Sequence, residues 1–271
     1  MAEHKKFVAR KSLGQNFLQD ENVVRKIIKA IDPKPGELII EVGPGFGVLT
    51  APLLESGCRY VGVEVDDRLI SGLRKRFGQR DNFTLFHQDF RRFDVRSVIT
   101  HSGEKVRLVG NIPYHITSSI IFTAFDFFMH LRDMTLMVQR EVAERIAAAP
   151  GSKTYGILSV ISQTYAVPQV LFHVPPTVFV PRPDVESSIV SWDFQAPRPK
   201  PPQDAALYAR LVRTVFNQRR KKLRNTLKGL ADAESIAAQT GIDLSRRPET
   251  LTVEEFIVLA DTILSMPENR K

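Results

Sequence analysis

Two glycines and two acidic residues have the types and the spacing of a nucleoside pocket. Gly43 and Gly45 lie in a G-P-G-F-G loop directly after an apolar run, where missing side chains let the backbone turn sharply and approach a ligand. Glu64 ends the next apolar run, about twenty residues further on, and its carboxylate can accept both hydroxyl protons of a ribose. Asp89 ends a third run, where its carboxylate can accept a hydrogen bond from an adenine amino group beside the ring of Phe90. These residues predict a pocket for an adenosine moiety.

The ligand that this pocket favours has no pyrophosphate. The dinucleotide-binding fingerprint requires a third glycine at position 48, where this chain has Val48. S-adenosylmethionine is therefore the economical candidate for the cofactor, and NAD is the alternative.

The string Asn111-Ile112-Pro113-Tyr114 predicts which reaction the pocket performs. Methyl transfer from a sulfonium to an aryl amine requires a nitrogen lone pair, normally delocalised into the ring, to be aimed at the methyl carbon. The side-chain oxygen of Asn111 and the backbone carbonyl before Pro113 can accept both amine hydrogens and stabilise the growing positive charge. Tyr114 can stack on the base. Since the product ammonium is acidic enough to lose its proton to water, positioning and electrostatics are expected to supply most of the rate.

Alternating apolar runs and amphipathic stretches must place these groups at one edge of a sheet. The predicted strands are 38–42, 60–65, 83–87, 106–109 and 135–138, and the predicted helices between them are 48–55, 67–77 and 118–128. This alternation is typical of βαβ units with a mostly parallel sheet, whose carboxyl ends meet at one edge. Residues 170–173 and 187–194 are expected to add a closing antiparallel pair of strands.

A proline-rich segment divides the chain. Residues 196–202 read A-P-R-P-K-P-P, which forbids a helix and favours an extended, stiff connector. We therefore expect an α/β domain at 1–195 and a small all-helical domain at 203–271. The helices predicted in the second domain are 205–216, 221–230, 234–240 and 253–264.

The charge pattern predicts a polyanionic partner. The 271 residues hold 38 Lys and Arg against 30 Asp and Glu, and residues 210–228 contain no acid. Repulsion along that basic stretch is uncompensated unless phosphates supply the counter-charge. The predicted RNA contacts are Arg219, Arg220, Lys221, Lys222 and Arg224. A smaller basic arm at 1–12 is expected either to contact RNA or to be disordered.

Composition excludes several other classes of protein. The chain has no apolar run long enough to span a membrane and no N-terminal apolar stretch typical of a secretory signal. Cys58 is the only cysteine, so no internal disulfide or cysteine-cluster zinc site can form, and the histidines lack the spacing of metal ligands. We expect a cytoplasmic, metal-free protein that acts as a monomer.

Motifs along nearly the whole chain resemble the ribosomal RNA adenine dimethyltransferases. They are Gln15-Asn16-Phe17-Leu18, residues 41–45, Asn111-Ile112-Pro113-Tyr114, Phe179-Val180-Pro181-Arg182-Pro183 and residues 219–225. The chain length, the basic stretch at 210–228 and the tail at 246–251 resemble those of the KsgA-type small-subunit enzymes more than those of the Erm-type resistance methylases. Ile112 is a departure, because the KsgA type usually has Leu there and Ile is common in the Erm type.

The resemblance implies a Rossmann-like methyltransferase domain that dimethylates two adjacent adenosines near the 3′ end of 16S rRNA in the immature 30S subunit. It implies cofactor contacts from Asn16, Leu18, Gly43, Glu64, Asp89 and Asn111. It also implies that Phe179 faces the flipped base opposite Tyr114, replacing the stacking that the base loses. Two alternatives stay open: an Erm-type 23S rRNA methyltransferase, or a ribosome-assembly factor that binds RNA with vestigial catalysis.

Overall fold

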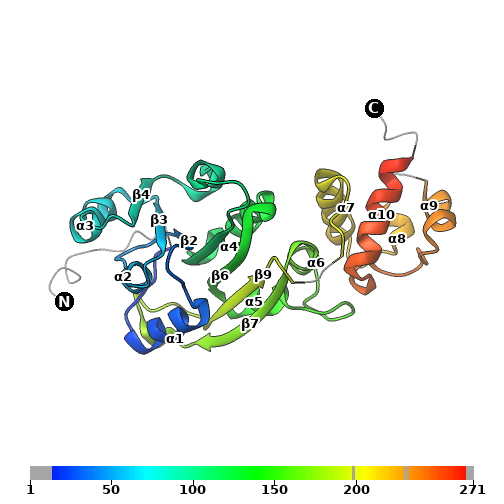
Figure 1. Cartoon of the computed structure of the whole chain (residues 1–271). Helices are drawn as coiled ribbons and strands as arrows, with labels where there is room; N and C mark the ends of the chain where they lie inside the picture. Colours follow the sequence, from blue (N-terminus) through cyan, green and yellow to red (C-terminus); the bar gives the residue numbers. More distant parts are fainter. Residues whose placement is uncertain (1–13, 197–198, 229, 231, 267–271) are drawn as a thin grey trace. The chain divides into compact units, whose positions relative to one another are not determined.

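The computed structural model describes residues 14–196, 199–228, 230 and 232–266 (Figure 1). The chain groups into two compact units, one of Met1–Ala143 and Gln169–Gln195, the other of Glu144–Pro168 and Ala196–Lys271. The second unit thus takes in residues 144–168, which we expected in the first domain, and the domain boundary at the proline-rich segment stays a prediction. The basic arm at 1–12 and the connector residues 197 and 198 lie outside the described residues.

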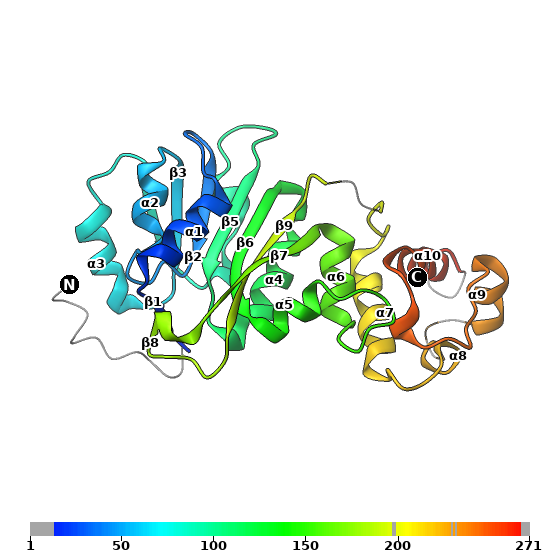
Figure 2. The ribbon, with the colours of Figure 1, turned by 90° about the horizontal axis from the view of Figure 1, so that it is seen from below.

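In the described part of the chain, seven strands form one sheet in the order β4-β3-β2-β5-β6-β9-β7. The order from β3 to β7 can be followed in Figure 2. They are β2 (Leu38–Val42), β3 (Arg59–Glu64), β4 (Phe83–His87), β5 (Val106–Asn111), β6 (Leu131–Gln139), β7 (Val167–Val174) and β9 (Ser187–Asp193). Strands β2 to β6 pair in parallel, and β9 pairs antiparallel to β6. Every residue of β2 is buried, as expected for an apolar parallel strand covered on both faces. The predicted mostly parallel sheet is confirmed.

The three helices predicted between the strands are present as α2 (Thr50–Glu55), α3 (Asp67–Phe77) and α4 (Thr117–Asp126). The first unit also contains α1 (Glu21–Ile31) and the start of α5 (Arg140–Ile146), which were not predicted. We did not predict α1, although its signals are present: Asp20 caps it by accepting the amides of Asn22 and Val23, and Ile27 and Ile31 bury one face. Short 3-10 turns lie at Phe90–Arg92, Val95–Val98, Tyr114–Ile116, Phe128–His130 and Pro176–Val178.

A separate antiparallel pair joins the two ends of the first unit's sequence. It consists of β1 (Phe17–Leu18) and β8 (Phe179–Val180), with Leu18 opposite Phe179. Each strand is too short to carry a periodic pattern, so this pair was not predicted.

Helices make up most of the second unit. They are α6 (Ile157–Tyr165), α7 (Ala205–Asn217), α8 (Leu223–Thr226), α9 (Ala233–Thr240) and α10 (Val253–Ser265), with a 3-10 turn at Pro248–Thr250. Of the helix predicted at 221–230 the structure forms only α8, which begins at Leu223 because the amides of Leu223 and Arg224 donate to the backbone oxygens of Arg246 and Leu244 and not to earlier residues. Among the described residues, none of the helices has the length and apolar character that a membrane crossing requires.

Candidate active site

A cavity of about 270 Å³ lies at the carboxyl ends of the parallel strands. Its lining includes all residues predicted to contact the cofactor, namely Asn16, Leu18, Gly43, Gly45, Glu64, Asp89, Phe90 and Asn111. Ile112, Pro113 and Tyr114 line the same cavity. Segments far apart in sequence meet here because parallel strands deliver their following loops to one edge.

The glycine loop is tied directly to Glu64. Gly43 and Gly45 have φ of 65° and 61°, a backbone region that side chains disfavour. The Gly45 amide donates to Glu64 at 3.0 Å, and the amides of Val65 and Asp66 donate to the other carboxylate oxygen at 2.9 Å each. Burial raises the pKa of Glu64, and these backbone amides oppose the rise. Three donors leave about one of the carboxylate's four acceptor positions for a ribose hydroxyl.

Asp89 is held in place by its neighbour Arg91. Its carboxylate accepts the backbone amide of Arg91 and pairs with the guanidinium of the same residue. The hydrogen bond from that side chain lowers the pKa of Asp89. Phe90 is buried, and its ring packs against Phe93 and Phe127. Asp89 is therefore an ionised acceptor at the cavity wall.

Glu41 is a cavity residue for which we predicted no role. It is buried in β2, and one carboxylate oxygen accepts the hydroxyls of Thr50 and Tyr60 at 2.6 Å each. Burial raises the pKa of Glu41 to about 7, and the nearby Glu64 adds to the rise. The signal was an acid inside the apolar run L-I-I-E-V. Gln15 was missed in the same way: it lines the cavity and donates to the buried Asp66 at 2.8 Å.

Asn111 is the last residue of β5, and its amide is fixed by another segment. Its side-chain nitrogen donates to the backbone oxygen of Asn16 at 3.1 Å. Within the described residues no donor reaches its side-chain oxygen, which is left as an acceptor. The Tyr114 hydroxyl lies 2.7 Å from the Ser187 hydroxyl, and this contact anchors the ring at the cavity.

Phe179 is the one predicted catalytic residue that does not line the cavity. Its side chain is 2% exposed and belongs to the apolar core that includes Leu18, its partner in the β1–β8 pair. Its stacking role stays a prediction.

The predicted RNA contacts lie in the second unit and differ in their surroundings. Arg220, Lys221, Lys222 and Arg224 are exposed, and in the described part of the chain none forms an ion pair. Arg219 is instead half-buried, and its guanidinium donates to the backbone oxygen of Ser152 at 3.1 Å. Four of the five are therefore available to a polyanion.

Known proteins are similar to this chain over nearly its whole length. A family model described as "Ribosomal RNA adenine dimethylase" matches residues 6–264. "Ribosomal RNA small subunit methyltransferase A" of Pseudomonas aeruginosa is 43% identical over 270 residues and covers 100% of both chains. The protein of that name from Vibrio parahaemolyticus is 39% identical and covers 96% of each.

Two solved structures share the fold. A dimethyladenosine transferase from Plasmodium falciparum has a TM-score of 0.71 at 22% identity, covering 90% of this chain and 95% of its own. The 23S rRNA methyltransferase ErmE has a TM-score of 0.66 at 22% identity, with coverage of 92% and 99%.

The glycine loop, the acids at the strand ends and the N-I-P-Y turn on one cavity define an S-adenosylmethionine-dependent methyltransferase. More particularly, the full-length matches show that the chain belongs to the ribosomal RNA adenine dimethylase family.

Proposed function

We propose that this protein transfers methyl groups from S-adenosylmethionine to the exocyclic amines of two adjacent adenosines near the 3′ end of 16S rRNA, in the immature 30S subunit. The choice of the small subunit is supported by relatives of about 40% identity that carry a small-subunit name. The observation that carries the methyl-transfer chemistry is the orientation of Asn111, whose nitrogen is used by Asn16 and whose oxygen is not.

The cavity residues fit an adenosine that carries no phosphate. Glu64 and Asp89 line the cavity with carboxylates, which accept hydrogen bonds from hydroxyl and amino groups. Their negative charge repels a pyrophosphate. Apart from Gly43 and its two neighbours in the chain, no atom of the described residues lies within 4 Å of the place where a side chain at Gly43 would begin, so such a side chain would fill open space in the cavity. This chemistry favours S-adenosylmethionine over NAD. When bound, it supplies a methyl group activated by a sulfonium charge.

The protein's contribution to the reaction is positioning. The Asn111 oxygen and the backbone carbonyl of Ile112 accept the two amine hydrogens of the target adenine, which turns the nitrogen lone pair out of conjugation. Tyr114, anchored by Ser187, provides an aromatic surface for the flipped base, and Phe179 is proposed as its second stacking partner. Preorganised acceptors of this kind stabilise charge that develops in the transition state.

Mapping of the methylated nucleotides tests the proposal. The purified protein, immature 30S particles and 50S particles are incubated with S-adenosylmethionine, and methylated adenosines are located on both RNAs. We expect two adjacent dimethyladenosines near the 3′ end of 16S rRNA. Methylation of 23S rRNA would identify an Erm-type activity, and particle binding without methylation would identify an assembly factor.

The substrate also implies where the protein acts. Small-subunit RNA of bacteria matures in the cytoplasm, so we place the activity there. We further propose that the protein acts as a monomer, which analytical ultracentrifugation of the chain with and without S-adenosylmethionine tests.

A further inference from the structure

The loop between α5 and α6 is docked onto the basic segment within the second unit. Arg219 donates to the backbone oxygen of Ser152 at 3.1 Å. The amide of Gly151 donates to the backbone oxygen of Glu249 at 2.6 Å, and the Glu249 carboxylate lies 3.9 Å from the Arg219 guanidinium. Two consecutive loop residues are therefore bonded to two separate segments of the helical unit.

Internal contacts also hold this loop in one conformation. The amide and the hydroxyl of Ser152 both donate to the backbone oxygen of Ala149, at 3.2 and 2.8 Å. Tyr155 is fully buried, and its ring meets Phe216 of α7 edge-on at 6.1 Å. Lys153 lies between these two fixed points, so its backbone position is set by the helical unit.

This docking brings the loop that carries Lys153 onto the basic segment. Lys153 and Arg220 each follow, by one residue, a member of the hydrogen-bonded pair Ser152 and Arg219. Both are exposed, and within the described residues neither forms an ion pair. Glu249 faces Arg219 and Glu255 pairs with Arg246, so these two acids are engaged, and the exposed Asp243 acts on Lys222 without forming an ion pair in the described part of the chain. The basic segment therefore holds more cations than acids paired with them, an arrangement that a polyanion stabilises.

We propose that Lys153 contacts rRNA phosphates together with Arg220, Lys221 and Lys222, and that Arg219 is a positioning residue that docks the loop. This inference rests on the proposed function and extends its RNA surface to residues 150–154. The Arg219 guanidinium is half-buried and bonded to Ser152, so we assign it to holding the loop and not to a phosphate contact of its own.

The salt dependence of binding to immature 30S particles tests the role of Lys153. Each phosphate contact contributes about 0.7 to 0.9 to the slope of log K against log salt. Lys153→Gln should lower the slope by this amount, so a fourfold rise in salt should weaken the variant's binding about threefold less than the wild type's. The matched control is Lys29→Gln, an exposed lysine on α1, which should leave the slope unchanged. An unchanged slope in Lys153→Gln overturns the proposed contact.

A charge-conserving substitution tests the role of Arg219. Arg219→Lys keeps the charge but loses the planar fork that reaches Ser152. A positioning role predicts that Arg219→Lys lowers the slope as much as Lys153→Gln does, and that the double variant shows no further loss. A wild-type slope in Arg219→Lys, or additive losses in the double variant, overturns it.

Controls separate this inference from the proposed function. Circular dichroism and S-adenosylmethionine affinity should match the wild type in all variants. A wild-type protein that methylates 16S rRNA while Lys153→Gln keeps the full slope overturns only the extended surface. A wild-type protein that neither binds nor methylates the particles overturns the proposed function and this surface with it.

Discussion

Asn111 is a better acceptor because its nitrogen is already used. An amide side chain can present either end to a ligand, and the hydrogen bond to Asn16 selects the oxygen. The same bond joins the segment around Asn16 to the end of β5, so the residue proposed to hold the target amine also ties together two walls of the cavity. Glu64 has a comparable double role, since it binds the glycine loop and lines the cavity.

Asn111→Ala should lower single-turnover methyl transfer by about 10²- to 10³-fold, because it removes a preorganised acceptor from the transition state. Rapid-quench measurement of methyl incorporation into immature 30S particles gives the rate, and circular dichroism checks the fold. The control Asn22→Ala, at the exposed start of α1, should retain the wild-type rate. Full activity in Asn111→Ala would contradict the assignment.

Glu41 should give the folded protein a measurable pH dependence. Its pKa rises from 4.5 to about 7, so between these values the native state binds a proton that the unfolded chain has lost. The contribution of Glu41 to the free energy of unfolding is therefore fully present below pH 4.5 and falls by about 3 kcal/mol as pH rises to 7 and beyond. In Glu41→Gln, which keeps an acceptor for Thr50 and Tyr60, this component should disappear.

Urea unfolding of the wild type and Glu41→Gln at pH 5, 6, 7 and 8 measures this effect. The difference between the two free energies should change across the series, because other titrating groups are common to both proteins. A difference that stays constant from pH 5 to pH 8 would refute the raised pKa.

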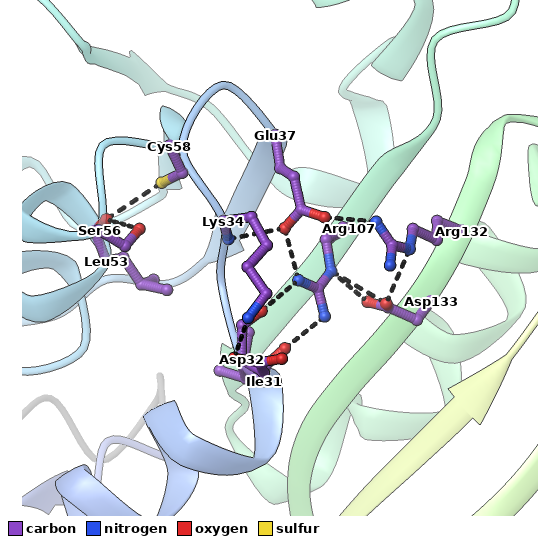
Figure 3. A network of polar contacts seen from close by, with 10 residues as sticks. All are labelled: Ile31, Asp32, Lys34, Glu37, Leu53, Ser56, Cys58, Arg107, Arg132 and Asp133. Atoms are coloured by element: carbon purple, nitrogen blue, oxygen red, sulfur yellow. Dashed lines mark hydrogen bonds and ion pairs between the residues drawn. The ribbon is translucent and has the colours of Figure 1, made fainter.

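At the scale of elements, a buried arginine joins α1 to the amino ends of the sheet strands (Figure 3). Arg107 of β5 donates to the last carbonyls of α1 at Ile31 and Asp32, pairs with Glu37 before β2, and forms two hydrogen bonds with Asp133 of β6. Its side chain is 8% exposed. The cavity lies at the carboxyl ends, so this network stabilises the edge of the sheet that carries no chemistry.

Arg107→Met should lower the free energy of unfolding by about 3 to 5 kcal/mol, since it leaves two largely buried carboxylates with only the half-exposed Arg132 as a cationic partner. The nearby pair of Lys34 and Asp32 is exposed, so the control Lys34→Gln should cost less than about 1 kcal/mol. Denaturant titration followed by far-UV circular dichroism measures both. Equal losses in the two variants would show that burial does not set the strength of this network.

At the scale of the whole molecule, the two units carry different charges for different tasks. The cavity of the first unit is lined by the carboxylates of Glu41, Glu64 and Asp89. The second unit exposes a run of cations that have no acidic partner among the described residues. Cofactor binding and RNA binding should therefore respond separately to mutation.

The triple variant Arg220→Gln, Lys221→Gln and Lys222→Gln should reduce the salt slope of particle binding by about 2 to 3, because it removes three phosphate contacts. S-adenosylmethionine affinity, measured by calorimetry, should equal that of the wild type. A wild-type slope in this variant would remove the segment from the RNA interface.

The sequence by itself determined the parallel sheet, the glycine loop, the strand-end acids and the N-I-P-Y turn. These features are local, because a buried parallel strand is an apolar run and its functional residue lies at the end of that run or just after it. The helix α1 also had local signals that we did not use, whereas the two-residue strands β1 and β8 had none.

Only the tertiary structure decided how several of these residues are used. It buried Phe179 against Leu18, gave Glu41 two hydroxyl donors, and turned Arg219 toward Ser152 and Glu249. Each outcome depends on a partner from a distant part of the chain. Spacing along the sequence specifies which groups are present, and packing between distant segments sets their burial and leaves each polar atom used or free.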